Sequence, residues 1–258
     1  MAGRRIAALL LSSLVLSGCV STRQVADLQF SPPQGDYRLL VLRPDVEVGS
    51  VGVGGVTQPR ADWTDQARAN LVAALRAQQA GRGGTMLVAE RRSGVPGVSA
   101  DEVADVERLQ NAVTISVALH RYLGYPLPTK RHRGLDYTLG DEAVQFGRKT
   151  GFDYALFLHA EDSFADNKRV ALQVLGIAGC FVGFCAPNGG GGGQLAYASL
   201  VDLRTGKMVW FNVLTAGSQV AGTKMGDIRS PDGATQMVER LMGRMKPGKA
   251  VRAAERSR

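Results

Sequence analysis

Cys19 is the side chain whose neighbours most clearly indicate a chemical reaction. It ends the stretch Leu16-Ser17-Gly18-Cys19, which follows a start with two arginines and an apolar run. A positive start, a short apolar core and small residues before a cleavage point are typical of a secretory signal peptide. The run is too short to cross a bilayer, which needs about 20 apolar residues. We therefore predict that residues 1–18 are a signal peptide, cleaved between Gly18 and Cys19.

The four residues that end at Cys19 resemble the lipobox of bacterial lipoproteins, in which leucine stands three residues before the cysteine. The resemblance implies that the thiol forms a thioether to a glycerolipid and that the protein carries fatty acids such as palmitate. Buried acyl chains contribute roughly 0.8 kcal/mol per CH₂, so the two or three chains usual in such proteins make a stable anchor. Valine follows the cysteine at position 20, and the absence of aspartate there favours the outer membrane.

Composition and charge indicate a globular chain with no affinity for nucleic acid. Hydrophobic residues make up 45% of the chain and charged residues 21%, which is ordinary for a globular protein. Of the net charge of +8, the signal peptide holds +2 and residues 244–258 hold +5, so the body over 19–243 carries only +1. A protein that binds nucleic acid would carry a basic stripe on its fold. We predict that the basic tail, residues 247–258, is disordered, and it either solubilises the protein or touches anionic lipids.

Hydrophobic periodicity predicts a single α+β domain over residues 36–246. Its clearest local signals are a capping box from Ser99 to Glu102, a tight turn at 204–206 and a helix start at Ser230. The expected sheet is mostly antiparallel, the helices pack largely on one face, and a lipidated tether over 19–35 precedes the domain. Strands are expected near 37–42, 46–56, 86–89, 152–159, 170–174, 195–203 and 208–214, and helices over 62–80, 99–123, 138–149 and 230–245.

This order of elements resembles the periplasmic α/β domain shared by the curli secretion lipoprotein CsgG and the amino-terminal domain of TolB. The similarity lies in residues 151–157, Gly-Phe-Asp-Tyr-Ala-Leu-Phe, which lead into a strand, and in the hairpin of residues 200–210. It covers roughly residues 36–246 and implies a role in envelope assembly or secretion, with self-association into a ring. The curli pore inserts alternating strands into the membrane. The apolar run 175–187 does not alternate, which argues against a pore.

Residues 175–193 are the most unusual segment of the chain, and two interpretations remain for it. It is either an apolar loop that touches a membrane or a partner, or a buried strand end followed by a glycine linker. On the first interpretation the contact residues are Ile177, Phe181, Val182 and Phe184. The same segment holds Cys180 and Cys185, which either form a disulfide or remain two buried thiols. An exported protein faces an oxidising compartment, which favours the disulfide slightly.

The remaining reactive side chains predict neither a metal site nor a catalytic site. The three histidines are scattered in the sequence, and the cluster of His159, Glu161 and Asp162 fits a strand-end histidine beside solvated acids. No nucleophile elbow and no paired carboxylates are recognisable. Trp63 and Trp210 are expected in the core. The histidines are His120, His132 and His159.

We therefore expect a non-enzymatic lipoprotein, anchored in the outer membrane and facing the periplasm, that acts through protein contacts in envelope assembly or secretion. Its partners would be other envelope proteins or further copies of itself, with no cofactor, metal ion or nucleic acid. Two alternatives remain: a module that binds an envelope ligand such as a glycan or a lipid, and a hydrolase whose site is not recognised.

Lipid attachment at Cys19 can be tested directly. Cells grown with labelled palmitate should incorporate the label into the native protein, whereas Cys19→Ser should carry no label and should leave the membrane fraction, because the thioether needs the sulfur. The account of the anchor is wrong if the native protein stays unlabelled, or if the Cys19→Ser protein remains in the membrane fraction to the same extent.

Overall fold

The strand β7 (Tyr154–Ala165) runs through the middle of the sheet in this computed structural model. From Ala155 to Leu158 every residue of β7 is buried. Successive side chains of a strand point to opposite faces, so both faces of the sheet must be covered. The structure describes residues 19–80, 82–127, 134–169, 171, 192–217, 226–243 and 245–246.

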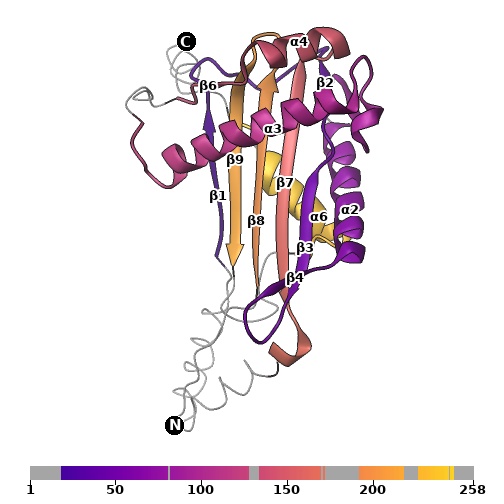
Figure 1. Ribbon diagram of the computed structural model, residues 1–258, viewed down its shortest axis with the longest axis vertical. Helices are drawn as coiled ribbons and strands as arrows, with labels where there is room; N and C mark the ends of the chain where they lie inside the picture. Colours follow the sequence, from indigo (N-terminus) through magenta and orange to yellow (C-terminus); the bar gives the residue numbers. More distant parts are fainter. Residues whose placement is uncertain are drawn as a thin grey trace, which may run out of the picture.

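The described strands form one mixed sheet in the order β1-β9-β8-β7-β2-β5 (Figure 1). In addition, β3 pairs with β7 and with β4, and β6 pairs with β9. Antiparallel ladders join β1, β9, β8 and β7, whereas β2 lies parallel to both β5 and β7, and β3 lies parallel to β7. The strands other than β7 are β1 (Cys19–Ala26), β2 (Arg38–Val41), β3 (Asp45–Val51), β4 (Thr57–Pro59), β5 (Thr85–Val88), β6 (Tyr137–Thr138), β8 (Gly193–Asp202) and β9 (Lys207–Gly217).

The fold class is α+β, as the sequence predicts, but the helices cover both faces of the sheet. One apolar core lies between the sheet and the helices α2 (Ala61–Gln79) and α6 (Pro231–Met242). A second core lies on the opposite face, under α3 (Ala100–Val117) and α4 (Gly140–Thr150). Figure 1 shows α3 crossing in front of the strands, α4 at their upper end and α6 behind them. The expectation that the helices lie largely on one face is corrected because the middle strands are apolar on both sides.

The predicted hairpin is confirmed between β8 and β9. The backbone N–H of Arg204 donates to the Asp202 carboxylate over 2.9 Å, which closes the turn. Gly206 has a φ of 72°, and a Cβ at this position would lie 2.4 Å from the carbonyl oxygen of Gly140. Only glycine fits such a position without strain. The turn therefore sets the register in which β8 and β9 pair.

Two of the predicted helix starts are confirmed in detail. At the start of α3, the Ser99 hydroxyl accepts the N–H of Glu102, and the Glu102 carboxylate accepts the N–H of Ser99. At the start of α6, the Ser230 hydroxyl accepts the N–H of Gly233 over 3.1 Å. The start of α2 differs, because its cap position is Arg60 and Asp62 lies in the first turn.

The first part of the expected tether is a strand, which corrects the prediction of a tether over residues 19–35. β1 pairs antiparallel with β9 along its whole length, from Cys19 opposite Gly217 to Ala26 opposite Trp210. Phe30, further along, is buried in the core that α2 and α6 cover. These partners lie almost 200 residues away in the sequence, so no local pattern could indicate the pairing.

A buried hydrogen bond ties β1 to the core. The Trp210 side chain is fully buried, and its indole N–H donates to the Gln24 side chain of β1 over 3.0 Å. A buried indole N–H without an acceptor would be costly. Trp210 therefore belongs to the core, as predicted, and it holds β1 in place.

Within the described part of the chain, no helix is both long and apolar enough to span a bilayer. The expected strand at 170–174 and the expected disordered tail at 247–258 lie outside the residues described, apart from residue 171.

The capping box at the start of α3 makes a stability prediction. Ser99→Ala should lower the free energy of unfolding by about 1 kcal/mol, because the N–H of Glu102 loses its acceptor. Urea denaturation measures the change, and Ser93→Ala, at an exposed serine outside any helix cap, serves as the control. An effect of Ser99→Ala no larger than that of the control would contradict the role of the cap.

Candidate functional site

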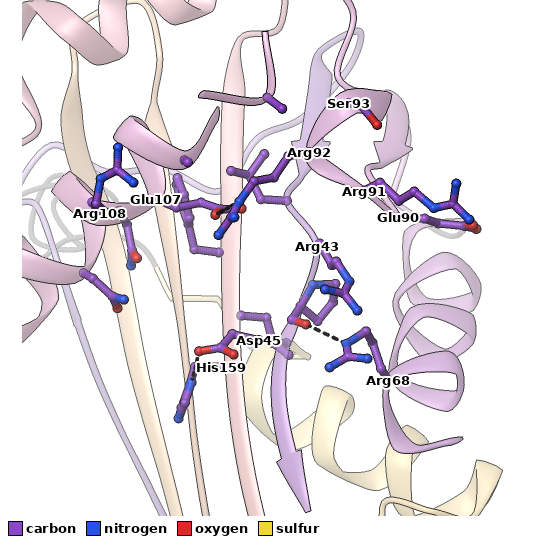
Figure 2. A pocket seen from close by; sticks show the side chains of 18 of the residues that line it. Arg43, Asp45, Arg68, Glu90, Arg91, Arg92, Ser93, Glu107, Arg108 and His159 are labelled. Atoms are coloured by element: carbon purple, nitrogen blue, oxygen red, sulfur yellow. Dashed lines mark hydrogen bonds and ion pairs between the residues drawn. The ribbon is translucent and has the colours of Figure 1, made fainter. Parts of the chain in front are cut away.

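A cleft of ligand size lies where β2 and β5 end, below the first half of α3. It has a volume of about 550 Å³, within the range of roughly 300–1,000 Å³ usual for small-molecule sites. β2 and β5 are parallel neighbours, and crevices beyond the carboxyl ends of parallel strands are the usual ligand sites of open α/β sheets. Figure 2 shows the charged side chains gathered around it. We call this feature the arginine cleft.

The cleft opens because the chain bulges between β2 and β3. Both strands pair with β7, with Val41 opposite Leu156 and Asp45 opposite His159. Three residues, 42–44, therefore stand opposite two, 157–158. An extra residue of this kind bends a strand and redirects its side chains. Pro44 suits the bulge because it has no N–H to donate to a ladder.

Arg68 of α2 fixes the shape of the bulge. Its guanidinium donates to the carbonyl oxygen of Pro44 over 3.2 Å and to that of Val46 over 3.3 Å. It also pairs with the Asp65 carboxylate at 2.6 Å. The side chain is only 17% exposed, so these bonds lie largely out of water and hold the backbone of the bulge against α2.

His159 lies on the floor of the cleft between two carboxylates. Its Nδ1 is 2.8 Å from Asp45 and its Nε2 is 2.9 Å from Glu161. A carboxylate only accepts hydrogen bonds, so both contacts are satisfied at once only when both ring nitrogens carry hydrogen. Burial opposes the charged form, but the bonds to Asp45 and Glu161 outweigh it and raise the pKa of His159. The bond from His159 in turn lowers the pKa of Asp45.

The Tyr197 ring forms another part of the floor. The Tyr197 ring stacks on His159, with centroids 4.7 Å apart and planes 18° from parallel, and on its other side lies Phe211. The three residues stand on the neighbouring strands β7, β8 and β9. Burial, together with the charges of Asp45 and Glu161, raises the pKa of Tyr197 to about 12. The phenol of Tyr197 is therefore neutral at physiological pH and can serve as a hydrogen-bond donor.

Guanidinium groups outnumber carboxylates around the cleft. The carboxylate of Glu107 pairs with Arg92 at 2.7 Å, and that of Glu90 pairs with Arg76, which is not part of the lining. Five arginines line the cleft against three carboxylates. The five are Arg43, Arg68, Arg91, Arg92 and Arg108, and the three are Asp45, Glu90 and Glu107.

The sequence prediction for the histidines is partly corrected. His159 does not stand at a strand end, because it lies in the middle of β7 and is 16% exposed. Asp162 belongs to the other face of the sheet, where it is buried and accepts a hydrogen bond from Gln194 over 2.8 Å. The carboxylate that joins His159 and Glu161 is that of Asp45, which the sequence analysis did not include. Asp45 stands more than 100 residues before His159 in the sequence.

Of the other side chains named from the sequence, some lie within the described residues and the rest lie outside them. His120 lies 2.8 Å from the Tyr137 hydroxyl, and the described residues hold no group of three side chains suited to a metal ion. Trp63 is only partly buried, with the guanidinium of Arg229 4.2 Å from its ring. The following lie outside the described residues: Gly18, His132, Ile177, Cys180, Phe181, Val182, Phe184 and Cys185.

A second surface stands out beside the edge strand β1. The carboxyl end of α3 and the π-helical turn η2 (Ala118–Tyr122) reach past β1 (Figure 1). Large apolar side chains there are exposed, among them Leu123 at 68%. We call this group the apolar tip, and its members are Ile115, Leu119, Leu123, Tyr125 and Leu127.

Comparisons with known proteins give no family for this chain. No protein-family model matches it, and no curated protein sequence matches it. Among solved structures it is similar to the PelC dodecamer from Paraburkholderia phytofirmans, at 12% identity and a TM-score of 0.36, over 88% of this chain and 100% of that one. A variant of that dodecamer matches at 13% identity and a TM-score of 0.35, over 86% and 98%. Scores this low establish neither a shared family nor a shared function, and the resemblance to the CsgG and TolB domains stays a prediction.

The ion pairs of His159 predict a pH-dependent stability. A raised pKa in the folded protein means that the contribution is fully present below the pKa of about 6.5 of an unfolded histidine and is lost as the pH rises through the folded value. His159→Gln should therefore lower the melting temperature more at pH 6 than at pH 9. Equal losses at both pH values would contradict the paired imidazolium.

A double-mutant cycle isolates the contact between His159 and Asp45. At pH 6, Asp45→Asn should destabilise the native protein more than it destabilises the His159→Gln protein, with a coupling energy of up to about 1 kcal/mol because Asp45 is well exposed. Independent effects of the two substitutions would show that the pair does not form.

Proposed function

We propose that this protein is a periplasm-facing lipoprotein of the outer membrane that acts, without catalysis, through contacts with other proteins in cell-envelope assembly or secretion. Two features support the proposal: the lipobox-like sequence that ends at Cys19, and the exposed apolar tip. The tip carries the argument for protein contacts, because contiguous apolar side chains on a water-exposed surface mark interaction sites.

The position of Cys19 implies an orientation for the domain. Cys19 is the first residue of β1 and stands opposite Gly217, which in turn stands opposite Gly193 at the start of β8. An acyl anchor on Cys19 would hold this end of the sheet close to the membrane, since β1 leaves no linker after the cysteine. β7 ends and β8 begins at the same end of the sheet. The described residues that flank the apolar run 175–187 therefore also lie on the side of the anchor.

The apolar tip is held against the edge of the sheet. The Tyr122 hydroxyl donates to the backbone carbonyl of Arg23 over 2.6 Å, and the Arg23 guanidinium lies 5.1 Å from the Tyr122 ring. Tyr122 thus fixes η2 on β1. An edge strand presents backbone groups that another chain can pair with, and here the edge and the apolar tip lie side by side.

The partner that fits this surface has an apolar face and a strand that can extend the sheet at β1. A second copy of the chain is one such partner, which agrees with the ring expected from the resemblance. Sedimentation velocity of the purified protein, compared with the Leu119→Asp/Leu123→Asp variant, separates self-association from contact with a different protein.

Photo-crosslinking in intact cells tests the proposal. A crosslinking residue placed at Leu123 should give a defined covalent adduct with a protein of the envelope, identified by mass spectrometry. The matched control is the same residue at Val56, which is 70% exposed but stands on the β3–β4 hairpin, away from the tip. Absence of an adduct at Leu123, or the same adducts from both positions, would contradict a contact role for the apolar tip.

A second function is favoured by one observation, the arginine cleft. A polar cleft of ligand size supports the alternative that the protein binds an envelope ligand. The two functions are compatible, because the cleft opens beneath the amino-terminal half of α3 and the tip lies at the opposite end of that helix.

A further inference from the structure

We propose that the arginine cleft binds a small soluble ligand through a phosphate or carboxylate group, held between Arg43 and its neighbouring guanidinium groups. This inference specifies the ligand-binding function and does not rest on the apolar tip. It stands on three observations: the surplus of positive charge, the arrangement of Arg43 and Arg68, and the polar floor of the cleft.

The lining of the cleft holds more positive charge than its own carboxylates neutralise. Among the residues that the structure describes, the carboxylates lining the cleft already have cationic partners: Asp45 has His159, Glu90 has Arg76 and Glu107 has Arg92. Arg108 pairs with Asp105 outside the cleft. No ion pair to another described residue engages Arg43 or Arg91. Both side chains are exposed, so both guanidinium groups can meet an anion from solution.

Arg43 and Arg68 are neighbours in the lining of the cleft (Figure 2). Arg43 stands on the bulge between β2 and β3, and Figure 2 shows its side chain extending towards Arg68. Both guanidinium groups lie near enough to Asp45 to lower the pKa of that carboxyl. Arg68 uses three N–H groups on Pro44, Val46 and Asp65. A guanidinium has five such groups, so two remain for a further acceptor.

Two neighbouring guanidinium groups favour a particular ligand chemistry. Their planar forks match carboxylate and phosphate oxygens, which accept two parallel hydrogen bonds from each fork. An anion between Arg43 and Arg68 would also relieve the repulsion between their like charges. The five cationic side chains of the lining other than His159 are all arginines, so the cleft offers planar forks where lysine would offer point charges.

Neutral polar side chains also line the cleft and are available to the rest of the ligand. Asn111 and Gln110 of α3, Ser93 and the Tyr197 phenol supply neutral hydrogen-bonding groups in the lining. The Gln110 amide donates to Thr114 and Ser199, whereas Asn111 is exposed and its side-chain oxygen accepts a hydrogen bond from the Tyr197 hydroxyl over 3.4 Å. Such groups suit hydroxyls, so the favoured class is a sugar acid or a sugar phosphate.

The cleft stands away from the end of the sheet that carries Cys19. Tyr197 lies four residues along β8 from Gly193, which corresponds to about 13 Å in a strand. If Cys19 is anchored, the cleft faces the periplasm above the bilayer. We therefore assign the anion to a soluble molecule, and a lipid headgroup is the other source of the same chemistry.

Calorimetric titration of the purified full-length protein with inorganic phosphate, glucuronate and glucose 6-phosphate tests the inference. We expect saturable binding of at least one anion, weakened by salt, and weakened about tenfold or more in the Arg43→Gln/Arg91→Gln variant. Arg240→Gln removes one charge from an exposed arginine on α6, on the far face of the sheet, and should bind as the native protein does. Glucose, which has no anionic group, should not bind.

Co-sedimentation with vesicles separates the two sources of the anion. Binding of the soluble anions assigns a soluble ligand, whereas binding only to vesicles that contain phosphatidylglycerol, lost in the Arg43→Gln/Arg91→Gln variant, assigns a lipid headgroup to the same cleft. The inference is overturned if neither soluble anions nor these vesicles bind, or if the double variant and Arg240→Gln bind equally well. Circular dichroism of each variant shows whether a loss of binding is a loss of folding.

Discussion

The structure depends on one strand, β7, that pairs with two different strands in succession along its length. β7 pairs in parallel first with β2 and then with β3, and the chain between them has one residue more than the part of β7 opposite. The extra residue cannot be absorbed in a regular ladder, so the backbone must bulge. The bulge separates two buried strands, turns Arg43 outwards and creates the space that α3 covers only in part. The arginine cleft is built around this irregularity, with Arg43 and Asp45 on the bulge or directly after it.

The bulge persists because its polar backbone groups have partners. Carbonyl groups that leave a ladder must find other donors, and the guanidinium of Arg68 supplies them to Pro44 and Val46. The same side chain joins β3 to α2, and α2 packs against α6 over one face of the sheet. On the other face of the sheet, the hydrogen bond between His159 and Asp45 joins β7 to β3. The cleft is therefore built by groups that also hold the layers together.

The sequence predicted the local parts of the fold well. The capping box at Ser99, the turn at Gly206 and the start of α6 at Ser230 depend on neighbours within a few residues, and each was confirmed. The layer arrangement was predicted less well, because a strand that is buried on both faces looks like a plain apolar run. β1 was mistaken for a tether because its stability comes from pairing with β9 and from the bond between Gln24 and Trp210.

The candidate site was largely invisible in the sequence for the same reason. Its arginines come from the bulge, from α2, from the segment after β5 and from α3, and each resembles an ordinary surface residue where it stands. His159 and Glu161 are near neighbours and could be noticed, but Asp45 joins them only through the parallel pairing of β3 with β7. The neighbouring Asp162 was grouped with them although strand alternation places it on the opposite face, a signal that could have been read from its position.

The most direct test of this account is anomalous diffraction from crystals of the protein soaked in tungstate, a heavy analogue of phosphate. The account predicts an anomalous peak in the arginine cleft, within hydrogen-bonding distance of the Arg43 and Arg68 guanidinium groups, with three residues of the β2–β3 chain opposite two of β7. A regular ladder at this point, or tungstate bound elsewhere while the cleft stays empty, would contradict it.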